Sequence, residues 1–202
     1  LLYGLMLESF NDCAYAIAEH VDGSVEAFAS RMNEKAKELG CLDTHFVTPN
    51  GLDDKDEGGE HHTTAADLCR IMSYCTWKSP QCETFVSLTA TRSHTFTDLE
   101  GQSFSVSNKN AFLDMMDCAV TGKTGFTGKA GYCYVAAAEE GGRKYCIALL
   151  ACGWPNNKKY RWSDAKTLFK NGMDHYHMNE GAKQALEMHA MEIGRSYRKA
   201  RL

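Results

Sequence analysis

The sequence has no apolar run that approaches the ~18 residues a membrane-spanning helix needs. It has no strong excess of charge of either sign, because 22 Lys and Arg stand against 26 Asp and Glu, for a formal net charge of −4. Such a balance gives no reason to expect nucleic acid as a partner. Internal repeats and low-complexity segments are also lacking. The 202 residues, 44% of them hydrophobic and 24% charged, are therefore typical of a globular chain that buries a core.

A Cys-x-x-Cys pair is absent as well, although the chain has nine cysteines. This absence argues against a zinc ribbon or a thioredoxin-type site. An odd number of cysteines cannot pair fully within one chain, and several of them stand in apolar segments such as 132–135 and 145–147. We therefore interpret them as small buried thiols, which by themselves favour a reducing compartment.

The start of the chain lacks an initiator Met, a basic n-region and a small-residue cleavage site. Residues 1–7 have instead the pattern of the middle of a helix. We therefore expect the chain to be a piece of a longer protein, truncated at its N-terminus. In that case the lack of a signal peptide says nothing about export.

The first part of the chain, about residues 1–80, is predicted to be helical from the spacing of its apolar residues. We expect two helical pieces near the start, broken around residues 9–12, where Ser, Asn and Asp side chains compete for backbone hydrogen bonds. The next helix is predicted to begin at an N-cap Ser24 and to end at Gly40. After a loop over residues 41–62, a capping box that starts at Thr64 opens another helix.

The second part, about residues 83–153, is predicted to be strand-rich. An alternation of apolar and polar residues over 85–91 begins it. Two nearly continuous apolar runs follow at 132–138 and 144–152, and the segment between them contains a Gly-Gly pair that suits a tight turn. Such runs are typical of antiparallel strands covered by helices.

A further hairpin is expected where residues 98–102 separate two short aromatic segments. A helix over about 160–175 is predicted to close the strand-rich part, and residues 179–202 to form a C-terminal helical extension. The predicted fold class is therefore α+β, with an antiparallel sheet and packed helices in one domain over residues 1–178.

Two short motifs could carry chemistry. Ser9-Phe10-Asn11 lies at the break between helical pieces and supplies a hydroxyl and an amide, which can relay a proton and hold a carbonyl or amide group. Lys123-Thr124-Gly125 combines a positive charge, a hydroxyl donor and a glycine where a ligand backbone could approach. Taken alone, the first triplet is more typical of local capping and the second of a solvated strand end. Their order and their context make the pair more specific.

The order of these motifs resembles that of the low-molecular-mass penicillin-binding proteins, the serine D-alanyl-D-alanine carboxypeptidases of peptidase family S11. The resemblance covers about residues 1–175 and implies a serine β-lactamase/DD-peptidase-like fold. Several segments match the family in the same order. They are residues 1–12, 23–28, 49–52, 61–68 and 123–132.

The resemblance implies catalytic roles for three residues. Ser9 would transfer protons together with the family's motif lysine. Asn11 would bind an amide group of the substrate. Lys123 would add positive potential to the site and help to bind the terminal carboxylate of the substrate. No metal and no cofactor are implied.

Four further residues are expected in substrate binding. Thr124 would contact the terminal carboxylate, and Gly125 would leave room for the ligand backbone. The backbone N–H of Phe126 would belong to the oxyanion hole, which needs donors directed at the developing charge. Arg161 would neutralise the substrate carboxylate, for which a guanidinium has suitable geometry.

One departure from the family pattern matters most. The family's Ser-x-x-Lys motif, with the serine that becomes acylated, stands ahead of all the matched segments, and no Ser-x-x-Lys precedes Ser9 here. Ser163-x-x-Lys166 has the right letters but follows Lys123, so we interpret it as a coincidence on a surface helix. We expect this chain to be inactive, because acyl-enzyme chemistry needs the nucleophile. A missing segment would also leave a sheet edge free to pair with a second copy, as a homo-oligomer.

The adjacent residues His61 and His62, with several acidic residues nearby, make a metal site conceivable. Neighbouring histidines point in different directions on most backbones, however, and the chain has no His-x-x-x-His spacing. We interpret this stretch as a loop before a helix and predict no metal site.

For a whole protein of this kind, the resemblance implies removal of the terminal D-alanine from peptidoglycan stem peptides that end in D-Ala-D-Ala, through an acyl-serine. It also implies inhibition by β-lactams and a location outside the cytoplasmic membrane, at the cell envelope, with which nine mostly unpaired cysteines fit poorly. The alternative is a non-catalytic cell-wall protein that binds D-Ala-D-Ala ends in the same pocket. A Ser-x-x-Lys encoded upstream of Ser9 would exclude this alternative.

Overall fold

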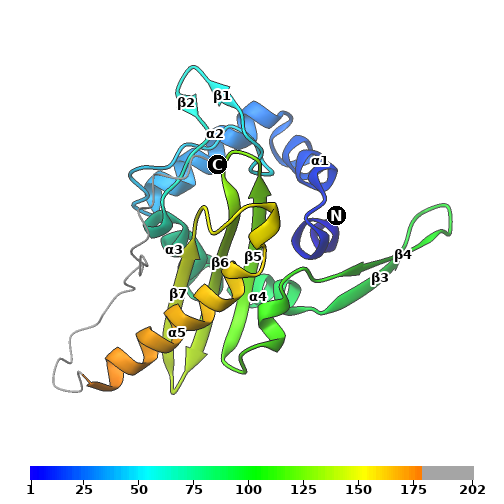
Figure 1. Ribbon diagram of the computed structural model, residues 1–202. Coiled ribbons are helices and arrows are strands. Elements are labelled where there is room, and N and C mark those ends of the chain that lie inside the picture. Colours follow the sequence, from blue (N-terminus) through cyan, green and yellow to red (C-terminus); the bar gives the residue numbers. More distant parts are fainter. Residues whose placement is uncertain (179–202) are drawn as a thin grey trace.

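A computed structural model describes residues 1–178 of the chain (Figure 1). Its centre is an antiparallel sheet in the strand order β5–β6–β7. The strands are β5 (Ala119–Thr127), β6 (Gly131–Glu140) and β7 (Arg143–Leu149). Gly141 and Gly142 join β6 to β7 with φ of +58° and +74°, the left-handed values that a tight type I′ hairpin turn requires. The predicted antiparallel pair is therefore confirmed, although its second strand ends before the predicted residue 152.

Helices cover both faces of this sheet (Figure 1). On one face, Leu168 and Phe169 of α5 (Tyr160–Met178) pack against alternate residues of β6 and β7. On the other face, Cys69 and Met72 of α3 (Ala65–Ser73) pack against the residues between them. The alternation arises because successive side chains of a strand point to opposite faces. The predicted α+β class with helices on an antiparallel sheet is confirmed.

The start of the chain is helical, as predicted. Its elements are the π-helical turn η1 (Gly4–Glu8), α1 (Asn11–Asp22) and α2 (Val25–Glu38). Ser24 caps α2 by accepting a hydrogen bond from the Ala27 N–H at 3.1 Å, and Gly40 follows the helix with φ of +75°. Thr64 caps α3 in the same way, accepting from the Asp67 N–H at 3.1 Å. These caps are local features, which is why the sequence alone located them.

The strand-like alternation predicted over residues 85–91 is wrong. This stretch belongs to α4 (Cys82–Ala90), which follows a second π-helical turn, η2 (Tyr74–Lys78). The Thr89 hydroxyl donates to the Phe85 carbonyl at 2.8 Å, one helical turn back. Thr89 is buried, and its hydroxyl accepts a hydrogen bond from the Thr121 hydroxyl of β5 at 2.5 Å. Tertiary packing of α4 on η2 and β5 decides the structure here, because a short alternating segment fits either period.

The predicted hairpin around residues 98–102 is confirmed. Its strands are β3 (Ser93–Thr97) and β4 (Ser103–Ser107), and it projects away from the rest of the molecule (Figure 1). The predicted loop over 41–62 contains a small hairpin of its own. Short elements complete the order: β1 (Lys55–Asp56), β2 (Gly59–Glu60), and the 3₁₀ turns η3 (Ala111–Asp114) and η4 (Pro155–Asn157).

The predicted C-terminal helical extension over residues 179–202 lies outside the described residues. Within residues 1–178, no helix combines the length and the apolar character that crossing a membrane requires.

Candidate active site

Ser9 lies on the sharp turn between η1 and α1. Its backbone has φ of +64°, in the left-handed region that residues with a side chain rarely adopt. The Ser9 N–H donates to the Gly4 carbonyl, and the Phe10 N–H donates to the same oxygen at 3.2 Å. The turn leaves the Ser9 side chain exposed.

Glu8, the residue before Ser9, ties this turn to the segment that follows β4. Its Oε1 accepts from the Ser107 N–H at 2.9 Å, and its Oε2 pairs with Lys109 Nζ at 2.7 Å. These contacts, with the Lys109 side chain first, lower the pKa of the Glu8 carboxyl. The sequence analysis did not find this anchor, because its partners are about one hundred residues away and no local pattern links them.

Lys123 stands in the middle of β5, with its side chain on the face of the sheet that α3 covers. Its cross-strand partner Val135 packs into the cluster on that face. Nζ donates to Ser9 Oγ at 2.6 Å and to the Thr124 carbonyl at 2.8 Å. Within residues 1–178, Lys123 has no carboxylate partner. Burial lowers the pKa of Lys123 to about 8.

The structure therefore brings together two of the predicted site residues, Ser9 and Lys123, which are 114 positions apart in the chain. Asn11, the third member of the predicted catalytic set, is the first residue of α1 and is exposed. Because Asn11 is only two residues beyond Ser9, the backbone turn at Ser9 sets the position of Asn11 at the start of α1.

Thr124, Gly125 and Phe126 continue β5 beyond Lys123. Thr124 and Phe126 pair with residues of β6 whose side chains lie on the α5 face, opposite to Lys123. A Cβ atom added at Gly125 would contact only Cys133 Cβ, at 3.9 Å, so the backbone is open there. The Phe126 ring is 43% exposed and lies 4.6 Å from the Tyr132 ring, measured between centroids.

Arg161 lies at the start of α5, stacked between two aromatic rings. Its guanidinium carbon is 4.8 Å from the centroid of Tyr132 and 4.6 Å from that of Trp162. Because Tyr132 also contacts Phe126, this stack places Arg161 beside the far end of β5. Burial lowers the pKa of its guanidinium, and its buried Nε has no hydrogen-bond partner within residues 1–178. No contact joins Arg161 to the Ser9–Lys123 pair among the described residues.

Tyr132 and Trp162 hold the Arg161 side chain, and no sequence pattern indicates this role for either of them. The position of Trp162 next to Arg161 gave no signal, because neighbouring residues on a helix do not usually stack. Tyr132 was counted only as a strand residue. Tyr132 contacts Arg161 beside the end of β5 because the pairing of β5 with β6 places Tyr132 opposite Phe126.

A cavity of about 440 Å³ lies elsewhere, between the first two helices and the loop before β2. Its lining includes Tyr15 of α1, Asn33 of α2 and Lys55 of β1, and neither Ser9 nor Lys123 belongs to it. This cavity is therefore separate from the contact between the two motifs.

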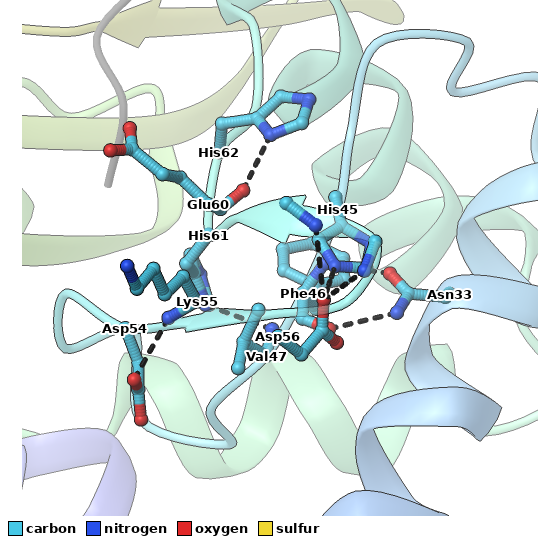
Figure 2. A network of polar contacts seen from close by, with 12 residues as sticks. Asn33, His45, Phe46, Val47, Asp54, Lys55, Asp56, Glu60, His61 and His62 are labelled. Carbon is cyan, nitrogen blue, oxygen red and sulfur yellow. Dashed lines mark hydrogen bonds and ion pairs between the residues drawn. The ribbon is translucent and has the colours of Figure 1, made fainter.

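The two adjacent histidines near β2 point in different directions (Figure 2). His61 is buried, and its Nδ1 accepts from the backbone N–H groups of Val47 at 3.1 Å and Thr48 at 3.3 Å. His62 turns toward the Glu60 carbonyl, with Nδ1 2.7 Å from that oxygen. Across the part of the chain that the structure describes, no three His, Cys, Asp or Glu residues are grouped so that they could hold a metal ion.

Acidification is expected to destabilise the fold through His61. Burial lowers its pKa from 6.5 to about 4, because the charged imidazolium is poorly solvated there. Protonated Nδ1 could also no longer accept the Val47 and Thr48 N–H groups. The unfolded chain therefore binds the proton more readily, so the stabilisation is present above pH 6.5 and is lost as the pH falls toward 4. We expect the free energy of unfolding in urea to fall by about 2 kcal/mol between about pH 7 and about pH 4.5.

A His61→Gln variant should lose this part of the pH dependence, and a His20→Gln variant at a surface position should keep it. An equal pH dependence in the parent chain and in His61→Gln would contradict the assignment to His61.

Comparisons with known proteins show the family to which the chain belongs. The family model described as D-alanyl-D-alanine carboxypeptidase, peptidase S11, matches residues 1–151. A D-alanyl-D-alanine carboxypeptidase of Mycobacterium tuberculosis is 37% identical over 172 residues, which are 85% of this chain and 56% of that protein. The chain thus spans little more than half the length of this relative.

Solved structures show the same likeness. The crystal structure of a D-alanyl-D-alanine carboxypeptidase from Mycobacterium tuberculosis matches with a TM-score of 0.74 at 34% identity, over 85% of this chain and 62% of that one. Penicillin-binding protein D2 from Listeria monocytogenes, in its cefotaxime-bound form, matches with a TM-score of 0.69 at 29% identity, over 85% of this chain and 64% of that one.

Proposed function

Since the chain belongs to the D-alanyl-D-alanine carboxypeptidase family, peptidase S11, we propose that it forms part of a serine peptidase of the cell wall. The whole enzyme would remove the terminal D-alanine from peptidoglycan stem peptides that end in D-Ala-D-Ala. It would act at the cell envelope, outside the cytoplasmic membrane, and β-lactams would inhibit it. Residues 1–178 would make up this chain's share of the peptidase domain.

One observation carries the proposal. Lys123 Nζ lies 2.6 Å from Ser9 Oγ, although 114 residues separate the two along the chain. The resemblance assigns these residues to the two motifs that must face each other for the chemistry to work. A chance occurrence of two triplets would not require them to touch.

The electrostatics of Lys123 support a role in binding an anion. Its side chain is half-buried and has no carboxylate partner among the described residues, so its charge is not neutralised within them. A peptide that ends in a free carboxylate would supply the missing negative charge in surroundings where the attraction is only weakly screened. Thr124 and Arg161 would add hydrogen bonds to that carboxylate.

The remaining site residues would serve the acyl transfer itself. A serine from a Ser-x-x-Lys motif would attack the carbonyl carbon between the two D-alanines, and the Phe126 N–H would help to stabilise the negative oxygen that forms. Ser9 would pass a proton to the departing amine of D-alanine, and Asn11 would hold an amide of the peptide. Water would then hydrolyse the acyl-serine. No metal and no cofactor take part in this proposal.

The 202-residue chain by itself is proposed to be inactive, because no Ser-x-x-Lys precedes Ser9 in it. The second candidate is a protein that binds D-Ala-D-Ala ends in the same pocket without cleaving them. The two candidates share the site and differ only in whether a nucleophile is supplied on the same polypeptide.

Release of D-alanine from a synthetic stem pentapeptide distinguishes the two candidates. We expect a polypeptide extended upstream to include a Ser-x-x-Lys motif to release D-alanine catalytically, and the 202-residue chain to release none. A matched pentapeptide that ends in L-alanine is the control for specificity. Binding of the D-alanine peptide by the extended polypeptide without release would instead support the binding protein and contradict the peptidase.

A further inference from the structure

Ser9 and Lys123 have, by themselves, the arrangement of a nucleophile and its base. We propose that Ser9 is a second nucleophile of this chain, which takes an acyl or phosphonyl group from an electrophilic donor while Lys123 accepts its proton. This activity would belong to the 202-residue chain and needs no Ser-x-x-Lys motif. It does not rest on the proposed peptidase function.

The surroundings of Lys123 suit a base. A neutral lysine amine has two N–H donors and one lone pair. One N–H is used by the Thr124 carbonyl at 2.8 Å, so the lone pair can accept the Ser9 hydroxyl proton over the 2.6 Å contact. Burial disfavours the charged ammonium, and a desolvated lysine next to a serine hydroxyl is a recognised way to activate that hydroxyl.

The acidic groups nearest to Ser9 in the chain are engaged elsewhere. Glu8 binds the Ser107 N–H and Lys109, and Asp12 accepts from the Cys13 N–H at 2.9 Å. Neither carboxylate pairs with Lys123, so neither would hold the lysine in its charged form. Thr89 and Thr121, which join α4 to β5 beside this position, are uncharged and bond to each other.

The surroundings of Ser9 suit a nucleophile. The left-handed turn at φ +64° leaves Ser9 exposed, while Lys123 is half-buried. A strained turn that presents a serine in this manner is typical of nucleophilic serines. The next residue, Phe10, is the N-cap of α1 and makes no side-chain bond to the first helical N–H groups. The first of these N–H groups, those of Asn11 and Asp12, lie two and three residues beyond Ser9 and favour a negative oxygen near it.

A fluorophosphonate is the simplest probe of this reaction. Ser9 Oγ attacks the phosphorus atom, a phosphorus–oxygen bond forms, the phosphorus–fluorine bond breaks and fluoride leaves. Lys123 takes the hydroxyl proton and releases it to water. The product is a stable phosphonate ester of Ser9, so each chain reacts once and no turnover is needed. The probe reacts with activated hydroxyl groups, which separates Ser9 from the nine thiols of the chain.

The experiment follows the labelling of the intact chain by mass spectrometry and maps the modified residue by peptide sequencing. We expect one label per chain, on Ser9, and none on Ser9→Ala. Lys123→Met should lower the labelling rate about 100-fold or more, the usual contribution of a general base. Ser30→Ala, at an exposed serine of α2, and Lys129→Met, at a surface lysine, should label at the parent rate.

A pH profile of the unmodified chain tests the base without any substitution. The labelling rate should rise as Lys123 loses its proton and level off above about pH 9. Labelling at other serines, an unchanged rate in a folded Lys123→Met, a flat pH profile or no labelling at all would each overturn the proposal. Because the probe needs no recognition of D-alanine, such a failure would leave the peptidase proposal standing.

Discussion

Replacing Lys123 with methionine in the extended polypeptide is expected to lower kcat/KM for D-alanine release about 1,000-fold. Methionine fills nearly the same volume with an apolar chain, so the half-buried position on β5 should stay packed. The substitution removes the positive charge that would meet the substrate carboxylate and the hydrogen-bond partner of Ser9. Steady-state kinetics with the D-Ala-D-Ala pentapeptide measure the effect.

Lys129→Met is the matched control for this substitution. Lys129 follows β5 in the chain but is a surface residue, and its Nζ lies 3.2 Å from Glu60 Oε1. An exposed ion pair of this kind contributes little to stability. We expect its kcat/KM to stay within about twofold of the parent value. A second comparison uses a pentapeptide with an amidated C-terminus, which lacks the carboxylate. If Lys123→Met had the same small effect as Lys129→Met, the proposed role of Lys123 would be wrong.

Truncating Phe112 to alanine is expected to lower the free energy of unfolding by about 4 kcal/mol. Phe112 is fully buried on η3, and its ring lies 5.9 Å from Tyr134 of β6 and 5.6 Å from Phe169 of α5. It therefore fills the space between the sheet and the helix that carries Arg161. Removing the ring leaves a cavity that packed strands and helices can close only in part.

Phe104→Ala is the control for this prediction, since Phe104 is 39% exposed on the projecting β3–β4 hairpin. We expect it to change the unfolding free energy by less than about 1 kcal/mol. Urea titrations of the three proteins at neutral pH provide the comparison. Equal losses for the two variants would show that the α5 face is not the main core of the described domain.

The predictions from sequence succeeded where the signal is local. Ser24 and Thr64 cap helices through bonds to residues three positions away, and the Gly141-Gly142 turn needs left-handed angles that glycine adopts freely. They failed over α4, where a short alternating stretch fits either period and packing against η2 and β5 decides. The order of the motifs was enough to indicate the family, which the match over residues 1–151 shows.

The sequence by itself determined the chemical groups available, the order of the motifs, the N-caps of α2 and α3 and the turn between β6 and β7. Those properties depend on residues within a few positions of one another. Only the tertiary structure decided that Ser9 and Lys123 touch, that Lys123 has no carboxylate partner among the described residues, and that Arg161 is stacked on Tyr132. These facts depend on contacts between residues far apart in the chain, whose distances and burial are set by how the helices pack on the sheet.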